Sequence, residues 1–138
     1  MIIDATNLIV GRLATVAAKK ALLGEKIEIV NCEKAVVTGK RDAVIKSYLQ
    51  KIHRGVPSQG PYFPKFSDRI VRRVIRGMLP YKQEKGRKAY ERIMCYLSVP
   101  ENLKDQKAET IKEANVSKLP NLKYVTIGDI AKQIGAKR

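Results

Sequence analysis

Residues 67 to 79 constrain the fold most, because their side chains separate into two chemically opposed faces at the angular spacing of an α-helix. One face is apolar and consists of Ile70, Val71, Val74, Ile75, Met78 and Leu79. The other face, which we call the arginine face, consists of Arg69, Arg72, Arg73 and Arg76, within an arc of roughly 100°. The sequence therefore predicts a helix with one side buried in a core and a row of guanidinium groups on the other.

The arginine face differs from an ordinary solvated helix surface. Solvated faces usually mix both signs of charge at i,i+4 spacing, and here only Asp68 precedes an arginine, Arg72, by four residues. Arg69 also falls in the first turn, where the helix dipole disfavours a cation. Because each guanidinium can clamp a phosphate with two parallel hydrogen bonds, we expect this face to contact nucleic acid rather than solvent alone.

The distribution of charge supports a polyanionic partner. The chain has 28 Lys and Arg against 13 Asp and Glu, a net charge of +15. Residues 40 to 92 carry 15 basic and 4 acidic side chains, a net of +11, and the remainder carries +4. Such a field attracts RNA or DNA. A membrane is not expected as the partner, because no apolar run approaches the roughly 18 residues of a spanning helix. The N-terminus also lacks the basic start of a signal peptide, so we expect a cytoplasmic protein.

The order of the predicted elements indicates an α/β fold. Alternating strand and helix patterns in the first half favour parallel strands joined by right-handed crossovers, with helices on the sheet faces. Strands are predicted at residues 1–5, 27–32 and 94–99, with a short extended segment at 124–127. Helices are predicted at residues 10–23, 42–52, 67–79, in a stretch that ends near 93, and at 128–134; residues 36–39 lead into the second of them.

The length of 138 residues predicts one domain, spanning residues 1–138. Residues 101–138 are expected to form a C-terminal extension packed on or beside the core. Within it, residues 101–123 are mixed in charge and weakly apolar, so we expect them to wrap the domain.

Residues 54 to 65 cannot continue a helix, because they contain three prolines and two glycines. They are predicted to form a long extended loop. Tyr62, Phe63 and Phe66 lie in or next to this loop beside Arg54 and Lys65. Two interpretations stay open: these rings stack on unpaired bases, or they pin the loop to the core.

The patterns expected of an enzyme are missing from the sequence. Gly39 and Lys40 are followed by Arg41 rather than by Ser or Thr, so the phosphate-binding loop motif fails. Gly11 stands alone, without the further glycines of a dinucleotide-binding loop. We therefore expect no catalytic residues, no cofactor and no small-molecule substrate.

Cysteine and histidine offer no metal site. Cys32 and Cys95 stand 63 positions apart, so we interpret both as small core residues in apolar, strand-like runs. The single histidine, His53, has no second histidine with which to share a metal, and a phosphate or turn contact suits it better than catalysis. The acidic residues are dispersed along the chain, so no metal is expected.

Several motifs resemble one family. The run Arg76-Gly77-Met78-Leu79-Pro80, then Gly86-Arg87 and Cys95-Tyr96-Leu97, is similar to the characteristic segment of the large-subunit ribosomal protein L-thirteen (L13) family. The family's opening is matched, in order, by Asp4-Ala5, Gly11-Arg12-Leu13-Ala14, the segment 30–35 and Thr38-Gly39-Lys40. The resemblance covers residues 1 to 100. The Tyr62-Phe63-Pro64 loop resembles archaeal and eukaryotic members, and the tail lacks the His-Pro-rich ending of bacterial ones.

The resemblance implies a three-layer α/β/α domain around a four-stranded parallel sheet. It also implies a non-enzymatic constituent of the large ribosomal subunit that binds large-subunit rRNA, supports early assembly and has other ribosomal proteins as neighbours. A free RNA-binding regulator of translation is the alternative function, and an RNA-processing enzyme is a third hypothesis.

The expected rRNA-binding residues combine the arginine face with the family motif and its basic flanks. The set is Arg12, Lys40, Arg41, Arg54, Lys65, Arg69, Arg72, Arg73, Arg76, Gly77, Lys82, Lys85, Arg87 and Lys88. For Gly77 two interpretations remain: its small size permits a close approach of RNA backbone, or it is merely a weak point in the helix.

Overall fold

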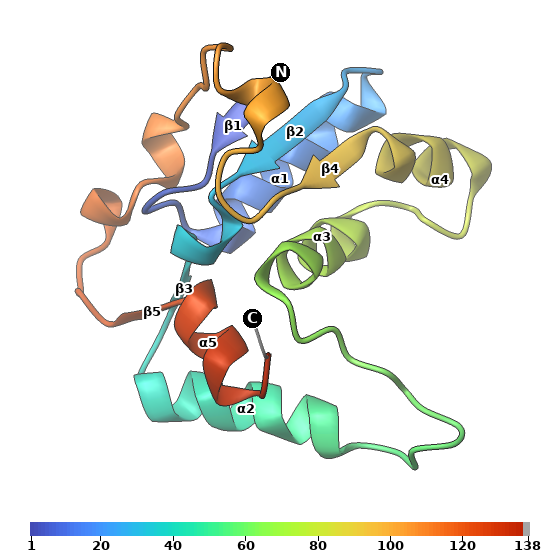
Figure 1. Ribbon diagram of the computed structural model, residues 1–138, viewed down its shortest axis with the longest axis vertical. Helices are drawn as coiled ribbons and strands as arrows, with labels where there is room; N and C mark the ends of the chain where they lie inside the picture. The colour runs from blue at the N-terminus through green and yellow to red at the C-terminus, as the bar shows by residue number, and fades with distance from the viewer. Residues whose placement is uncertain (137–138) are drawn as a thin grey trace.

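The computed structural model of the protein describes residues 1–136. Three short parallel strands form its main sheet in the order β1, β2, β4: β1 (Ile2–Asp4), β2 (Ile27–Val30) and β4 (Ile93–Cys95) (Figure 1). The register sets Ile3 opposite Ile29 and Ile29 opposite Cys95, so one apolar row crosses all of the strands. The α/β class and the parallel pairing predicted from the sequence are confirmed.

The helices agree closely with the predicted ranges. They are α1 (Val10–Leu22), α2 (Arg41–His53), α3 (Ser67–Met78), α4 (Glu84–Glu91) and α5 (Ile127–Gln133). Helix α1 ends where Gly24 takes a left-handed φ of 104°, a backbone conformation that favours glycine. The predicted strand at 94–99 is shorter than expected, because only residues up to Cys95 pair with β2.

A four-stranded parallel sheet, which the family resemblance implied, is not what the structure shows. Strand β3 (Val36–Thr38) pairs antiparallel with β5 (Tyr124–Thr126) in a separate two-stranded sheet. Only residues 31–35, which include the one-turn helix η1 (Cys32–Lys34), separate β2 from β3. A parallel crossover needs about a dozen residues or more, so β3 cannot return parallel beside β2.

The three-layer arrangement also needs correction, because within residues 1–136 the α-helices pack on one face of the main sheet and a one-turn helix lies on the other. On that face Ile3, Ile27 and Ile29 share a core with α1 and α3. On the opposite face Ile2 and Val30 pack against Leu103 of the one-turn helix η2 (Glu101–Leu103). The sheet is therefore covered on this side by the chain that follows β4, as Figure 1 shows.

The C-terminal extension follows β1 and then returns to the core. Asp4 donates its backbone N–H to the Glu109 carbonyl, and Glu109 donates to the carbonyl of Ile2. Two further one-turn helices, η3 (Lys112–Ala114) and η4 (Val116–Lys118), precede β5. Within the segment expected to wrap the domain, Leu103, Ala114 and Val116 are buried in apolar clusters, and residues 137–138 of the predicted extension lie outside the described residues.

The two faces of α3 are largely as predicted. Ile70, Val71, Ile75 and Leu79 are buried, while Val74 is only half-buried against the same core. The prediction for Met78 is wrong, because its side chain is 43% exposed. Met78 is central to the apolar arc but lies in the last turn of α3, beyond the core.

The carboxyl ends of β1 and β2 are joined by Asp4. Its Oδ1 accepts hydrogen bonds from the backbone and the hydroxyl of Thr6, at 3.0 and 2.7 Å, and from the Asn31 amide at 3.0 Å. Although burial alone raises the pKa of Asp4, these hydrogen bonds and the charge of Lys34 together lower it below its ordinary value. The motifs around Asp4 and Asn31 thus have a structural role.

Both cysteines are buried, as predicted, although Cys32 lies in η1 rather than in a strand. The pKa of the Cys32 thiol is raised, chiefly by a hydrogen bond with Cys95 and next by burial. Cys32 is therefore a protonated core residue and not a nucleophile.

Candidate nucleic-acid interface

Every arginine of the arginine face lies over an aromatic ring. The rings come from the loop before α3 and from the chain after it. From guanidinium carbon to ring centroid, the distances are 5.7 Å for Arg69 over Phe66, 4.5 Å for Arg72 over Tyr90, 4.7 Å for Arg73 over Phe63, and 4.9 Å for Arg76 over Tyr81. These distances are within the range of cation–π attraction, so the guanidinium groups are held in place without a carboxylate.

The positive charge of this region is almost entirely uncompensated. Within residues 1–136 the ion pairs are Lys26–Glu28, Lys88–Glu84 and Lys104–Glu101, and none of them includes an arginine. Asp68 and Arg72 do not form the pair that their spacing offered: Asp68 Oδ1 and Arg72 Nε are each buried without a hydrogen-bond partner among the described residues. The guanidinium charges therefore remain available to an external anion.

The arginine face borders a hollow of about 380 Å³, which we call the arginine hollow. It is lined by Pro64, Arg69, Arg72, Arg73, Arg76 and Tyr90. A second hollow of about 320 Å³, lined by Lys51, Arg54, Pro61, Phe63 and Arg73, adjoins it at Arg73. A third, of about 370 Å³, includes Lys65 and adjoins it at Pro64 and Arg69. The fold thus brings Arg54 and Lys65 to the arginine face.

The aromatic residues of the loop before α3 differ in their surroundings. Phe63 packs against the core and meets the Tyr48 ring edge-on, with 5.9 Å between centroids. Arg73 Nη1 donates to the Tyr62 carbonyl at 3.2 Å, which fastens the loop to α3. The Tyr62 side chain is 71% exposed. Phe63 therefore pins the loop, whereas Tyr62 remains open to a base.

The basic segment after α3 is positioned by a tight turn. A Cβ atom on Gly86 would lie 2.1 Å from the Pro80 carbonyl oxygen, so only glycine permits this approach of α4 to Pro80. The turn leaves the basic side chains of the segment exposed: Lys82, Lys85, Arg87 and Lys88. Lys88 pairs with Glu84 at 2.7 Å on the helix surface, a contact that contributes little stability.

Four further expected residues lie apart from these hollows, as the basic segment after α3 does: Arg12, Lys40, Arg41 and Gly77. Lys40 and Arg41 stand at the start of α2 and Arg54 follows its end, so a helix about 20 Å long separates them (Figure 1). Arg12, on α1, donates from Nη1 to the Glu113 carbonyl at 3.1 Å. Gly77 is exposed, and a Cβ there would have no heavy atom within 4 Å.

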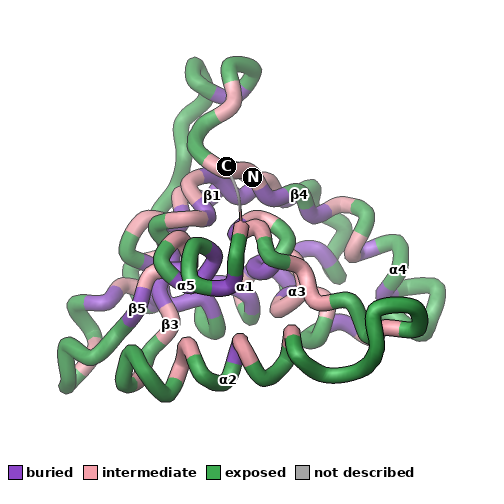
Figure 2. Tube along the Cα trace, turned by 60° about the horizontal axis from the view of Figure 1, so that its bottom comes forward, coloured by how far each residue is buried: buried purple, intermediate pink, exposed green. Residues whose placement is uncertain are grey.

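Sequence reasoning missed three residues that the structure places here. Lys51 lines the second hollow, and Tyr81 and Tyr90 support Arg76 and Arg72. Lys51 adds to the positive charge of the region, and this charge was the signal that could have identified it. Nothing in the local sequence pairs the two tyrosines with particular arginines, because these contacts join different elements. Figure 2 shows how exposed α2 and the adjoining loop are, compared with the buried core behind them.

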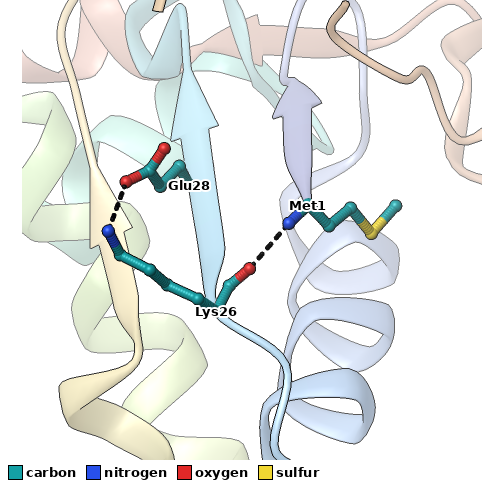
Figure 3. Close-up of polar contacts among 3 residues, drawn as sticks. All are labelled: Met1, Lys26 and Glu28. Carbon is teal, nitrogen blue, oxygen red and sulfur yellow. Dashed lines mark hydrogen bonds and ion pairs between the residues drawn. The ribbon is translucent and has the colours of Figure 1, made fainter. Parts of the chain in front are cut away.

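A larger hollow, of about 570 Å³, lies on the other side of the molecule and lacks this excess of positive charge. Two of its lining residues, Lys26 and Glu28, pair at 3.1 Å, and the Met1 amino group donates to the Lys26 carbonyl at 2.8 Å (Figure 3). These contacts tie the N-terminus to the start of β2.

Among residues 1–136, no group of three or more His, Cys, Asp or Glu side chains is arranged to hold a metal ion. The same residues contain no helix with the length and apolar character needed to cross a membrane.

Comparison with known proteins gives a consistent result. A family model described as Ribosomal protein L13 matches residues 1–102. A protein of Methanosarcina barkeri named large ribosomal subunit protein uL13 is 47% identical over 137 residues, which cover 99% of this chain and 98% of that protein. The protein of the same name from Methanopyrus kandleri is 44% identical over 136 residues, which cover 97% of this chain and 86% of its own length. The counterpart from Methanocaldococcus jannaschii is 43% identical over 140 residues.

Proposed function

The chain belongs to the ribosomal protein L13 family, and we infer that it is a structural constituent of the large ribosomal subunit, located in the ribosome in the cytoplasm. It is not an enzyme. The relatives' names give no support to the alternative of a free regulator of translation.

We propose further that the arginine face is its principal contact with large-subunit rRNA. The observation that carries this proposal is that the four guanidinium groups line one hollow and have no carboxylate within ion-pair distance among the described residues. Arg54 and Lys65 extend this contact on one side, and the basic segment with Lys82 and Lys85 extends it on the other. Arg87 and Lys88 belong to the same flank.

The remaining expected residues suit separate contacts. Lys40 and Arg41 lie at the far end of α2, and Arg12 lies beside the C-terminal extension. We expect them to contact other rRNA segments than the one at the arginine face. Neighbouring large-subunit proteins would complete the surroundings of the protein.

The mechanism is electrostatic and geometric. Each guanidinium offers in-plane donors that match two phosphate oxygens, and its binding releases counterions condensed on the RNA. Because the charges are fixed by rings rather than by carboxylates, they screen the repulsion between phosphates where RNA segments meet. This role needs no chemical step and supports assembly of the subunit.

The proposal is tested by the dependence of rRNA affinity on salt. With on the order of 6 to 10 phosphate contacts, affinity should fall by about 10³- to 10⁵-fold between 50 and 200 mM salt. Arg76→Ala should lower the slope of log affinity against log salt by about one, while the unfolding free energy hardly changes. Lys107→Ala is the matched control, since Lys107 is an exposed cation on the loop after η2. Equal slopes for both variants would show that the arginine face does not bind phosphate.

Incorporation into large subunits provides the second measurement. Arg72→Ala and Arg76→Ala should sediment less with large subunits at moderate salt than the Lys107→Ala protein. Normal incorporation of a double Arg72→Ala, Arg76→Ala variant would refute the proposed interface.

A further inference from the structure

The residues that line the arginine hollow are suited to binding a base as well as a phosphate. Arg72 and Arg76 both line it, and each has an aromatic ring on one side of its guanidinium group, Tyr90 at 4.5 Å and Tyr81 at 4.9 Å. A guanidinium group is planar, with two π-faces and its donors in the plane. When a ring covers one face, the opposite face is left for a ligand.

The chemistry of this arrangement matches an exposed base better than a paired one. In RNA recognition, unstacked bases stack on aromatic rings or on guanidinium planes, while donors at the guanidinium edge reach phosphate. A base within a duplex presents no free face, because its neighbours in the helix cover both. A duplex would thus use only the charges of the hollow.

We propose that the arginine hollow takes an unpaired nucleotide of the RNA, with its base stacked on the guanidinium faces of Arg72 and Arg76 and its phosphate held by Arg69 and Arg73. This proposal rests on the proposed function, since it specifies which RNA feature the arginine face recognises. Tyr81 is a positioning residue in it, because it holds the Arg76 guanidinium plane and does not line the hollow, whereas Tyr90 supports Arg72 and also lines the hollow.

Tyr81 permits the sharper test, because its side chain is 41% exposed and its loss removes little core packing. Tyr90 is half-buried against the core, so its replacement also affects stability. Tyr81→Leu removes the ring beneath Arg76, and Tyr81→Phe keeps the ring and loses only the hydroxyl. None of these changes alters the charge of the protein.

The experiment compares three RNA hairpins with nearly equal numbers of phosphates: one with a single bulged adenosine, one with an abasic bulge, and one fully paired. Base stacking on such surfaces contributes enough for about tenfold tighter binding of the bulged adenosine than of either other hairpin. Tyr81→Phe should keep this ratio, and Tyr81→Leu should reduce it towards one. The salt slope should be the same for the parent and both tyrosine variants.

Two outcomes would overturn the inference: equal binding of the three hairpins by the parent, or an undiminished ratio in Tyr81→Leu. Its failure is distinguishable from failure of the proposed function. If Arg76→Ala still lowers the salt slope while the hairpins are bound equally, the arginine face binds RNA but does not recognise an unpaired base.

Discussion

Gly86 and Gly77 form a natural pair for testing how the interface is built, because both are helical glycines, Gly77 just before the basic segment and Gly86 within it. They differ in their surroundings. A Cβ on Gly86 would lie 2.1 Å from the Pro80 oxygen and 2.9 Å from the Tyr81 nitrogen, whereas a Cβ on Gly77 would meet nothing within 4 Å. Alanine at the two positions should therefore have opposite effects on stability.

The magnitudes follow from these contacts. Alanine at position 86 requires the backbone near Pro80 to retreat by about 0.9 Å before the contact reaches an attainable 3.0 Å. Overpacking of this kind costs about 1–3 kcal/mol, of which the better helix propensity of alanine offsets about 1 kcal/mol. Gly77→Ala has only the propensity gain, about 0.5–1 kcal/mol near a helix end. The two variants should differ by about 2 kcal/mol.

Urea unfolding at neutral pH measures this difference directly, and thermal unfolding should separate the variants by several degrees. Equal stability of Gly86→Ala and Gly77→Ala would refute the close approach of α4 to Pro80. The same proteins test the role of Gly77 in RNA binding. If RNA backbone approaches this open surface, Gly77→Ala should bind rRNA more weakly although it is the more stable variant. Unchanged affinity would leave Gly77 as merely a weak point in the helix.

Two further predictions concern the core and the carboxyl ends of the strands. Ile75→Asp should lower the unfolding free energy by several kcal/mol, because Ile75 is fully buried, while Met78→Asp on the same apolar arc should cost far less; similar urea midpoints would contradict the observed burial. The lowered pKa of Asp4 stabilises the fold above the unfolded value of about 3.9, and this stabilisation is lost as pH falls through the folded pKa. The thermal stability of Asp4→Asn should therefore fall less steeply than that of the parent as the pH is lowered from about 5 to 2. A variant with the same acid-side slope as the parent would show that the Asp4 hydrogen bonds do not favour its ionised form.

The elements that the sequence predicted are those determined by neighbouring residues. Helix α3 follows from a periodic pattern of aliphatic residues and arginines, and the loop before it follows from its prolines and glycines. The pairing of β3 with β5 is different in kind, because Val37 and Val125 meet only after the whole chain has folded. The crossover rule was sufficient to exclude a parallel β3, but only once β3 was identified as a strand and its distance from β2 was known.

The candidate site shows the same division between local and distant contacts. The arginine face could be predicted because its members share one helix, whereas the rings that support it come from different segments. Phe63 and Phe66 precede α3, and Tyr81 and Tyr90 follow it. The apolar pattern also predicted wrongly that Met78 is buried, because the angular position of a residue around a helix does not show where along the helix the core ends.

Asp68 and Arg72 do not pair, and aromatic rings position the arginines of this surface instead. For a surface that binds phosphate, a ring is better suited to this task than a carboxylate. A carboxylate would hold a guanidinium group by occupying its in-plane donors and cancelling its charge, and both are what a phosphate needs. An aromatic ring holds the same group from its face, so the donors and the positive charge remain available. Arg72 lies over Tyr90 and makes no ion pair among the described residues. The rings thus hold the arginine face in position before RNA binds, and the positive charge of the guanidinium groups stays available to the RNA.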